Sequence, residues 1–307
     1  MKLNVVLITY NHTKFIQDSL RSILLQKTDF EFNVLVCDDQ STDDTLAKIK
    51  EYARNTTIGF RYLDADKNLG ITRNYERAFH ACDAEYIAVL EGDDFWTDPY
   101  RLQKHVDFLD RHLECSMSFN RYIRGDIEAV EYEVCPQGNY TGDYALITAR
   151  DLARENRISN FSACVYRKTA IDTLPDALFE LTAYDWITNI MVGRNGMIGC
   201  LTDVMSFYRV HSESAWSSNR KEDNLDSTLE SIQQYDEFTN HLFKEEFAAY
   251  RRKINRRKLT LKLLPGSKSR KAKSALRTIR DLTPPILIFL LEMIVPPKIM
   301  NKMRVKE

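Results

Sequence analysis

Apolar runs alternate with amphipathic segments along the first 112 residues of the chain. Short runs of aliphatic and β-branched residues predict buried strands at 3–9, 32–37, 60–63 and 85–90. Between and after these runs, apolar residues recur at helical spacing and predict helices at about 15–24, 43–54, 71–82 and 101–112. This alternation predicts an α/β fold with a Rossmann-like, doubly wound, mostly parallel sheet flanked by helices.

The pattern beyond residue 112 is less regular. It predicts a strand at 115–123, a long loop or small hairpin at 124–147, and a short helix that starts with a loose capping box at Thr148. Beyond this helix it predicts a strand at 158–167, a helix at 182–194, and two strands at 197–201 and 204–211 joined by a tight turn. Helical spacing returns at 224–247, and we expect this helix to pack back on the preceding domain. The predicted domains are therefore 1–220 and a helical, basic extension at 221–307.

Polar side chains follow three of the predicted strands at the point where each strand ends. They are Thr9, the pair Asp38 and Asp39, and the pair Asp93 and Asp94. The carboxyl ends of parallel strands meet at one edge of a sheet, where ligands of such folds bind. Closely spaced carboxylates repel one another, so the Glu91 to Asp94 segment suggests a site for a hard divalent cation. The alternative is an acidic turn that caps the next helix.

Two common phosphate-binding motifs are absent. The sequence contains no G-x-G-x-x-G after the first strand and no G-x-x-x-x-G-K-[ST]. This argues against a dinucleotide-dependent dehydrogenase and a P-loop NTPase. Acidic strand ends would repel a bare nucleotide, whereas a bridging divalent cation reverses that interaction.

Charge and cysteine usage add information about location. The six cysteines are scattered, with no C-x-x-C pair, which favours buried free thiols in a reducing cytoplasm, and the first apolar run is too short for a signal peptide. The net charge of −1 hides an asymmetry, because residues 251–307 carry about +14 and residues 1–250 about −15.

Six motifs, taken together and in this order, resemble the GT-A-fold, family 2 type glycosyltransferases, which are inverting enzymes that use nucleotide-diphospho-sugars. The resemblance covers about residues 3–212, and its motifs are Ile8-Thr9-Tyr10-Asn11, Val36-Cys37-Asp38-Asp39-Gln40-Ser41-Thr42-Asp43, Asn68-Leu69-Gly70-Ile71-Thr72-Arg73-Asn74, Leu90-Glu91-Gly92-Asp93-Asp94, Tyr184-Asp185-Trp186 and Tyr208-Arg209-Val210-His211.

The resemblance implies a nucleotide site at the strand ends. Thr9, Tyr10 and Asn11 would line the base and ribose pocket, Asp38 would hydrogen-bond the base or ribose, Arg73 would lie near the diphosphate, and Asp93 would contact ribose or metal-bound water. The alternatives are an ordinary turn after the first strand, a cap of the second helix, for which Asp39 is the better candidate, and a solvated helix arginine.

The resemblance also implies a cation site and a base. Asp94 would ligate Mg²⁺ or Mn²⁺, and His211 would complete the metal or diphosphate site unless it is an ordinary surface or core histidine. Asp185 would be the general base, ionised with the help of the helix dipole, unless it only caps its helix. Trp186 is expected in the core.

Three features qualify the resemblance. Tyr184 stands where the family frequently has a second acid, which puts an acceptor contact in doubt, and Glu91 stands where Asp is commoner. The Q-x-x-R-W signature of processive synthases is absent, which favours transfer of one sugar per encounter. The implied function is a metal-dependent, inverting transfer from a UDP-type donor to a glycan or lipid-linked acceptor in cell-surface polysaccharide synthesis. The alternatives are a non-catalytic nucleotide-sugar-binding scaffold and a nucleotidyltransferase.

The basic C-terminal region predicts a partner of its own. Residues 251–280 contain 13 Lys and Arg and no acid, and an apolar stretch of ten residues follows at 286–295, which is too short to span a bilayer. Such a region suits an anionic cytoplasmic membrane surface and a peripheral enzyme on the inner face of the cell membrane. Nucleic acid is not expected as a partner, because it would leave the apolar stretch without a role. A solvated helical hairpin or a dimer contact is the structural alternative.

Overall fold

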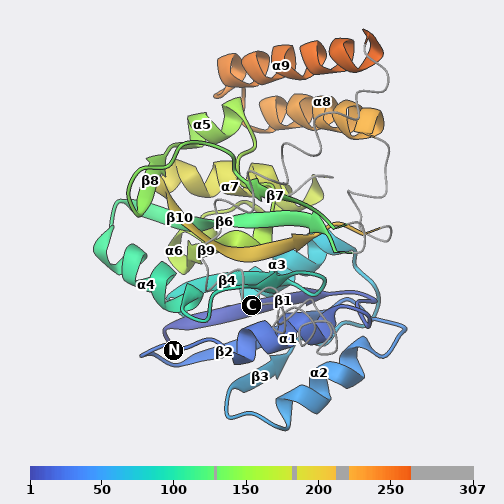
Figure 1. Ribbon diagram of the computed structural model, residues 1–307, viewed down its shortest axis with the longest axis vertical. Helices are drawn as coiled ribbons and strands as arrows, with labels where there is room; N and C mark the ends of the chain where they lie inside the picture. The colour runs from blue at the N-terminus through green and yellow to red at the C-terminus, as the bar shows by residue number, and fades with distance from the viewer. Residues whose placement is uncertain (128–129, 182–184, 212–220, 264–307) are drawn as a thin grey trace, which may run out of the picture.

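One mixed sheet of ten strands runs through the centre of the computed structural model, which describes residues 1–127, 130–181, 185–211 and 221–263 (Figure 1). Its first half is parallel, in the order β3-β2-β1-β4, with bounds Gly59–Tyr62, Phe32–Asp38, Leu3–Thr9 and Tyr86–Glu91. The predicted doubly wound parallel sheet is confirmed for this half.

The second half of the sheet is mixed and was only partly predicted. Strands β9 (Cys164–Arg167), β6 (Cys115–Asp126), β10 (Met197–Arg209) and β5 (Phe95–Trp96) continue the order from β4. Of these neighbours, only β6 and β10 are parallel, and β7 (Glu131–Cys135) and β8 (Tyr144–Ile147) pair at the side with β6 and β10.

Helices cover both faces of the sheet, because alternate residues of each central strand point to opposite sides. Val5 and Leu7 of β1 join one apolar cluster with α1 (Ile16–Leu24), α2 (Thr45–Ala53) and α4 (Arg101–Arg111). Val6 and Ile8 join a second cluster with α3 (Ile71–Ala81), α5 (Ala149–Arg154), α7 (Asp185–Val192), α8 (Lys221–Phe238) and α9 (Lys244–Leu263).

Two local predictions have clear outcomes. The capping box at Thr148 is confirmed, since its hydroxyl accepts from Asp151 N and the Asp151 carboxylate accepts from Thr148 N. The two strands predicted at 197–201 and 204–211 are wrong. They form the single strand β10, in which register shifts between Leu201 and Ser206 take up the polar residues as a bulge.

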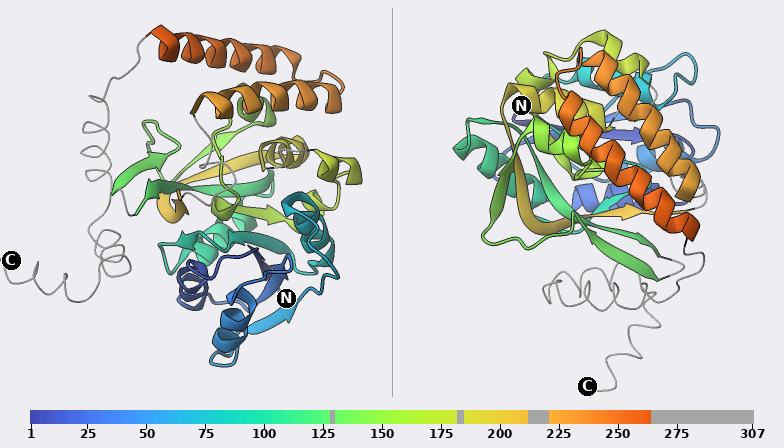
Figure 2. Two further views of the ribbon diagram at one scale, coloured as in Figure 1. Left: turned by 90° about the vertical axis from the view of Figure 1, so that its right-hand side faces the viewer. Right: turned by 90° about the horizontal axis from the view of Figure 1, so that it is seen from above.

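The segment at 224–247 packs back on the sheet domain as predicted, but as two helices. The chain turns through Asn240 and His241, both with positive φ, between α8 and α9. The two helices lie side by side over α5 and α7 (Figure 2). Trp186 of α7 is buried as predicted, and Tyr235, Phe247 and Tyr250 pack edge-on around it. Helices α8 and α9 therefore contribute residues to the core of the main body.

Part of the predicted extension lies outside the described residues. This applies to the apolar stretch 286–295 and to all basic residues beyond 263. Within the described part of the chain, none of the helices is both long enough and apolar enough to cross a membrane.

Candidate active site

The ends of β1, β2 and β4 form one polar edge, as the sequence predicted. Asp39 N donates to Thr9 O at 2.9 Å and Gly92 N donates to Ile8 O at 2.8 Å, which ties both neighbouring strand ends to β1. The backbone of Gly92 runs so close that an added Cβ would meet His12 Nδ1 at 2.6 Å and Thr9 Oγ1 at 2.7 Å. His12 therefore belongs to this edge. It was missed in the sequence analysis, although it lies only three residues beyond the end of the first strand.

Asp93 faces two histidines. His211 Nε2 lies 3.1 Å from Asp93 Oδ2, and His12 Nε2 lies 3.9 Å from the same oxygen. Burial alone would raise the pKa of Asp93, but the hydrogen bond from His211 and the charges of both histidines outweigh it and hold the pKa below its usual value. The structure thus brings Asp93 and His211 together across 118 residues of sequence.

Asp94 is fully buried and points into the protein. Its Oδ1 accepts from the backbone N of Arg209 at 2.9 Å, and its Oδ2 accepts from Ser162 Oγ at 2.6 Å. Burial, followed by the charges of Asp93 and Glu91, raises the pKa of Asp94 well above its usual value. The role of Asp94 as a metal ligand stays a prediction, and its two hydrogen bonds describe an anchor for the strand end.

Arg209 clamps the same segment from β10. Its Nε donates to Asp93 O at 2.8 Å, and its second guanidinium nitrogen donates to Asp18 at 2.8 Å. The guanidinium also lies over the rings of Phe15 and Phe95. The sequence motif Tyr208-Arg209-Val210-His211 included this residue, but no role was predicted for it.

The carboxylates of Glu91, Asp93 and Asp94 can each offer an oxygen within 4.8 Å of the others. Tyr75 donates to Glu91 at 2.9 Å. Carboxylate oxygens are the ligands that Mg²⁺ and Mn²⁺ prefer. These carboxylates therefore fit a hard divalent cation. Both oxygens of Asp94 accept hydrogen bonds from a hydroxyl and a backbone N–H of the core, whereas Asp93 contacts histidines.

The residues after β2 form a tightly bonded turn. Asp38 accepts from Ser41 N at 2.9 Å and from Ser41 Oγ at 2.5 Å. Asp39 accepts from the backbone N atoms of Leu69 and Gly70 at 2.8 and 2.9 Å. Asp39 therefore fixes the turn before α3, and the alternative that it caps α2 is wrong. Asp43 instead bonds the first residue of that helix, Thr45.

The other predicted nucleotide residues differ in their surroundings. Thr9 is buried and hydrogen-bonds His12, whereas Tyr10 is 43% exposed. Asn11 has a positive φ and joins the loops after β1 and β2, accepting from Thr42 N at 2.8 Å. Arg73 forms exposed ion pairs with Glu76 and Glu180, and the structure does not bring it to the carboxylates.

Asp185 begins α7, as predicted. The sequence led us to expect the helix dipole to favour its ionised form. Burial instead dominates and raises the pKa of Asp185, against hydrogen bonds from the backbone N–H groups of Trp186 and of Asp185 itself. The neighbouring Tyr184 lies outside the described residues, so the expectation attached to it stays open.

Asp185 and Glu91 approach the same strand from different elements. Burial raises the pKa of Cys164 to about 12, and the negative charges of both Asp185 and Glu91 add to that rise. The same two charges add to the raised pKa of Tyr166, which burial dominates. Both residues belong to β9, which lies next to β4 in the sheet. The charges of the predicted base and of Glu91 thus both act on β9.

Comparison with known proteins decides the family. The model of "Glycosyl transferase family 2" matches residues 4–174, which is more than half of the chain. The chain belongs to glycosyl transferase family 2. The match includes the acidic ends of β2 and β4 and excludes α7, β10 and the C-terminal helices.

Named relatives support the assignment at different coverage. Uncharacterized protein Rv1520 of Mycobacterium tuberculosis is 32% identical over 218 residues, which is 70% of this chain and 61% of the relative. The chain thus spans about three fifths of that relative's length. The putative teichuronic acid biosynthesis glycosyltransferase TuaG of Bacillus subtilis is 22% identical and is covered to 84%, with 71% of this chain.

Solved structures support the fold. Residues 1–349 of TarS from S. aureus, in complex with UDP-GlcNAc, match with a TM-score of 0.60 at 18% identity, covering 98% of this chain and 83% of that one. The mannosyltransferase PcManGT from Pyrobaculum calidifontis, in complex with GDP-Man and Mn²⁺, matches with a TM-score of 0.59 at 14% identity, covering 100% and 88%. These likenesses show a common GT-A architecture.

Proposed function

We propose that the chain is a metal-dependent, inverting glycosyltransferase. It moves one sugar from a nucleotide-diphospho-sugar, a UDP-sugar, to a hydroxyl of a glycan or lipid-linked acceptor in cell-surface polysaccharide synthesis. The observation that carries the proposal is that the charges of both Asp185 and Glu91 act on Cys164 and Tyr166 of β9, the strand that lies next to β4. Family membership and the names of the relatives support it.

The residues divide the reaction between them. Asp185 accepts the proton of the acceptor hydroxyl while that oxygen forms a bond to the anomeric carbon. The bond from the anomeric carbon to the diphosphate oxygen breaks, and the nucleoside diphosphate leaves with the electron pair on the opposite face. A Mg²⁺ or Mn²⁺ ion, when bound, neutralises charge on the diphosphate.

The hydrogen bonds favour a division of labour among the acids. Asp93 and His211 hold the cation, since Asp93 is partly accessible and His211 adjoins it. Asp94 keeps the strand end in place through Ser162 and Arg209, and it remains the predicted ligand of the cation beside them. Thr9, Tyr10, Asn11 and Asp38 line the nucleotide pocket at the neighbouring strand ends, and Arg73 stays the weakest member of that set because Glu76 and Glu180 already pair with it.

One experiment tests the activity. Purified protein is incubated with a panel of UDP-, GDP- and TDP-sugars and Mn²⁺, and hydrolysis and transfer are followed by release of the nucleoside diphosphate. We expect activity with a UDP-sugar that EDTA abolishes and added Mn²⁺ restores. Asp185→Asn should lower the rate of transfer by about 10² to 10⁴ and keep donor binding. Full activity in EDTA or in Asp185→Asn would overturn the mechanism, and nucleotide-sugar binding without turnover would favour the scaffold alternative.

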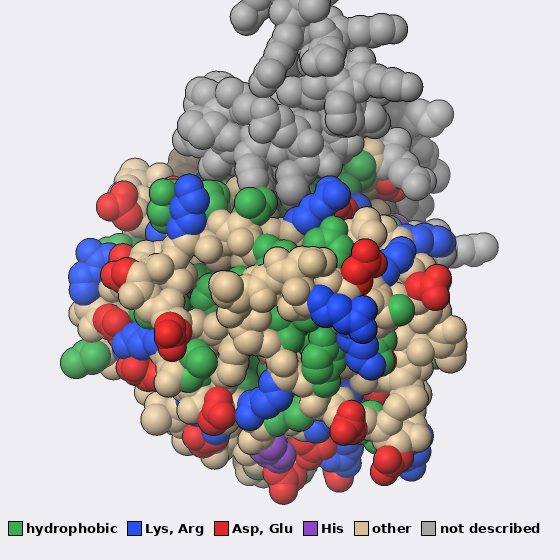
Figure 3. All heavy atoms as spheres, turned by 90° about the horizontal axis from the view of Figure 1, so that it is seen from below, with side chains coloured by type: hydrophobic (Ala, Val, Ile, Leu, Met, Phe, Trp, Pro, Cys, Tyr) green, Lys and Arg blue, Asp and Glu red, His purple; other side chains and the backbone are tan. Residues whose placement is uncertain are grey.

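We also propose that the basic C-terminal region holds the protein on an anionic cytoplasmic membrane surface. In the described part of the region, Arg251, Arg252 and Lys253 are exposed on α9. On the face seen in Figure 3, by contrast, Lys and Arg are interspersed with Asp and Glu. Sedimentation with phosphatidylglycerol vesicles should be lost when residues 264–307 are removed, a cut that keeps α9 whole. Unchanged sedimentation of this truncated chain would refute a membrane role for residues 264–307.

A further inference from the structure

Arg101 is the first residue of α4, and its side chain is fully buried. Its guanidinium carbon lies 4.4 Å from the centre of the Trp96 ring. Burial lowers the pKa of Arg101 to about 9, so the group carries its charge at neutral pH. The acceptors of its hydrogen bonds are neutral, a side-chain amide oxygen and backbone carbonyls. A buried cation with neutral partners tends to destabilise a fold, and such exceptions are expected at functional sites.

The guanidinium group bridges two elements of the sheet domain. Its Nε donates to Asn120 Oδ1 at 2.9 Å, and its Nη2 donates to Ser162 O at 3.0 Å. Asn120 belongs to β6, whereas Ser162 belongs to η1 (Phe161–Ala163), the short 3₁₀ helix that leads into β9. Its Nη1 has no hydrogen-bond partner in the part of the chain that the structure describes. The arginine thus fixes the position of η1 relative to β6.

A buried polar network holds Asn120 in place. His105, one turn further along α4, lies with Nε2 3.1 Å from Asn120 Oδ1 and with Nδ1 2.8 Å from Ser118 Oγ. Burial, followed by the charge of Arg101, lowers the pKa of His105 well below its usual value, so this histidine is neutral. The Asn120 amide nitrogen donates to Ser206 Oγ of β10 at 2.9 Å. Asn120 is therefore a fixed anchor for the guanidinium group.

Ser162 connects the guanidinium group to the acidic end of β4. Its carbonyl oxygen accepts from Arg101 and, at 2.9 Å, from Trp96 Nε1. Its hydroxyl donates to Asp94 Oδ2 at 2.6 Å and accepts from Glu91 N at 3.1 Å. One serine thus separates the guanidinium group from the Asp94 carboxylate, and a shift of η1 would move the hydroxyl that fixes this carboxylate.

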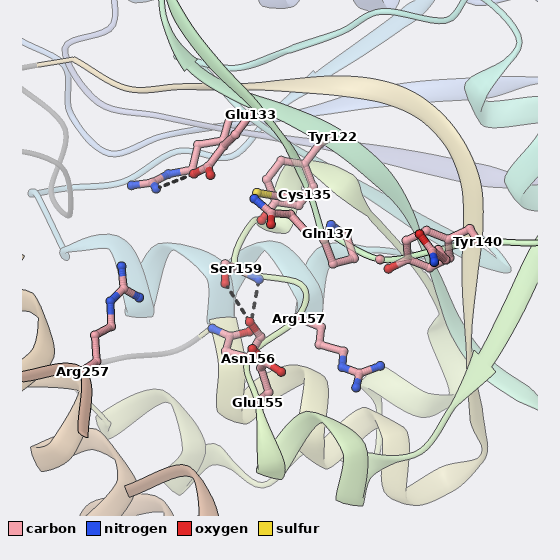
Figure 4. A pocket seen from close by; sticks show the side chains of 14 residues that line it. Tyr122, Glu133, Cys135, Gln137, Tyr140, Glu155, Asn156, Arg157, Ser159 and Arg257 are labelled. Atoms are coloured by element: carbon pink, nitrogen blue, oxygen red, sulfur yellow. Dashed lines mark hydrogen bonds and ion pairs between the residues drawn. The ribbon is translucent and has the colours of Figure 1, made fainter. Parts of the chain in front are cut away.

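These contacts indicate that Arg101 acts through the protein and not on a ligand. A pocket of about 670 Å³ opens between the β6–β7 hairpin, the loop after α5 and helix α9 (Figure 4). Tyr122 of β6 lines this pocket, but neither Asn120 nor Arg101 does. The guanidinium group therefore contributes nothing to this pocket, and its partners are those of the core.

We propose that Arg101 is a positioning residue for the cation and donor site. It holds Ser162 so that the serine hydroxyl fixes the carboxylate of Asp94. The inference rests on the proposed function, because it takes Asp94 as the predicted ligand of the cation. Removing a residue that orients a metal ligand typically weakens metal binding about 10- to 100-fold. Lysine cannot replace the arginine, because it lacks the planar fork that reaches Asn120 and Ser162 together.

The test measures Mn²⁺ binding with UDP present, from the electron paramagnetic resonance signal of free Mn²⁺. Arg101→Met removes the charge and Arg101→Lys keeps it without the fork, so the comparison stands if either variant fails to fold. Each is also combined with Ser162→Ala. Arg167→Met is the matched control, because Arg167 donates to Cys115 O at 2.7 Å and pairs in the sheet with Tyr86, at the opposite end of β4. Circular dichroism gives the unfolding temperature of every protein.

We expect the affinity for Mn²⁺ to fall about tenfold or more in both Arg101 variants and in Ser162→Ala. Adding Ser162→Ala to an Arg101 variant should weaken binding by no more than about a further twofold, since the two residues act along one path. Arg167→Met should lower the unfolding temperature and keep the affinity for Mn²⁺.

Three results would each overturn the proposal: unchanged Mn²⁺ affinity in a folded Arg101 variant, additive losses in the double variants, or an equal loss in Arg167→Met. A parent chain that binds no Mn²⁺ in the presence of UDP would instead count against the proposed function itself.

Discussion

His211 Nε2 lies 3.1 Å from Asp93 Oδ2, although 118 residues separate the two along the chain. Strand β10 delivers His211 to the end of β4, and the ring of Phe15 lies 4.4 Å from the histidine ring. Asp93 lies in the part of the chain that the family model matches, residues 4–174, whereas His211 lies outside it.

The first prediction concerns this pair. His211→Ala and Asp93→Ala should each raise the Mn²⁺ concentration needed for half-maximal activity by about tenfold or more, in line with the loss of one ligand or its supporting partner. His241→Ala is the control, because His241 bonds Asp236 on the surface between α8 and α9. An unchanged Mn²⁺ titration in both variants would place the cation elsewhere.

The second prediction concerns the pH dependence set by Asp185. Because burial raises the pKa of this carboxyl, the base loses its charge at a pH above the usual range of aspartate. The rate of transfer should therefore fall on the acidic side with a midpoint above about 3.9, the ordinary aspartate pKa. A rate profile that is flat down to pH 4.5 would contradict the assignment.

The same residue should show a conflict between activity and stability. A carboxyl whose pKa is raised in the folded state destabilises the folded protein when it is ionised. This loss of unfolding free energy is complete above the pKa of the folded state and disappears as the pH falls below the pKa of the unfolded state. Asp185→Asn should lower the rate by about 10² to 10⁴ and leave Tm unchanged or higher at pH 7.5. A clear drop in Tm would indicate a structural role for the carboxylate.

The third prediction concerns Ser162 as a positioning residue. Its hydroxyl donates to Asp94 and accepts from Glu91 N at 3.1 Å, while its carbonyl oxygen accepts from Trp96 Nε1 at 2.9 Å. Ser162→Ala should cost about 1.5 to 3 kcal/mol of unfolding free energy, as for a buried hydrogen bond to a charged group, and should also weaken donor binding. Ser22→Ala, which removes a buried hydroxyl bonded within α1, should affect stability alone.

The fourth prediction concerns the close approach at Gly92. Gly92→Ala should weaken donor binding, because the new methyl group must displace His12 and Thr9 at the strand end. Gly59→Ala is the matched control, since its Cβ would meet only Asn33 Cβ at an ordinary 3.7 Å. Equal UDP-sugar affinity in the two variants would exclude this edge from the donor site.

The fifth prediction tests whether the C-terminal helices fold separately. Phe247→Ala should cost about 3 to 5 kcal/mol, the usual range for a large buried aromatic residue, because Phe247 is buried against Trp186 of the main body. Leu242→Ala should cost little, since Leu242 is 44% exposed. A separate melting transition for the helices, unaffected by changes at Trp186, would support an independent domain.

Much of the parallel half of the fold was predictable from the sequence, because each strand there is an apolar run followed by an amphipathic helix. The site was predictable where chemistry follows a strand directly, as at Asp38 and Asp93. His12 was missed because its role depends on Gly92, which only the folded chain brings close. The environment of Asp94 could not be predicted, since Ser162 and Arg209 reach it from distant elements. The single strand β10 was missed because its bulge looks like a polar turn in sequence.

The pairing of β10 with β6 also has a consequence for synthesis on the ribosome. Asp94 accepts a hydrogen bond from the backbone N of Arg209, and Asp93 pairs with His211. These two contacts of the acidic segment can form only after the last strand of the sheet has been made. A nascent chain that ends near residue 174 contains every acid of the strand ends but neither of these donors. The acidic edge therefore lacks these two hydrogen bonds until residues 209 and 211 have left the exit tunnel, and the order of translation makes the donor site one of the last parts of the body to be completed.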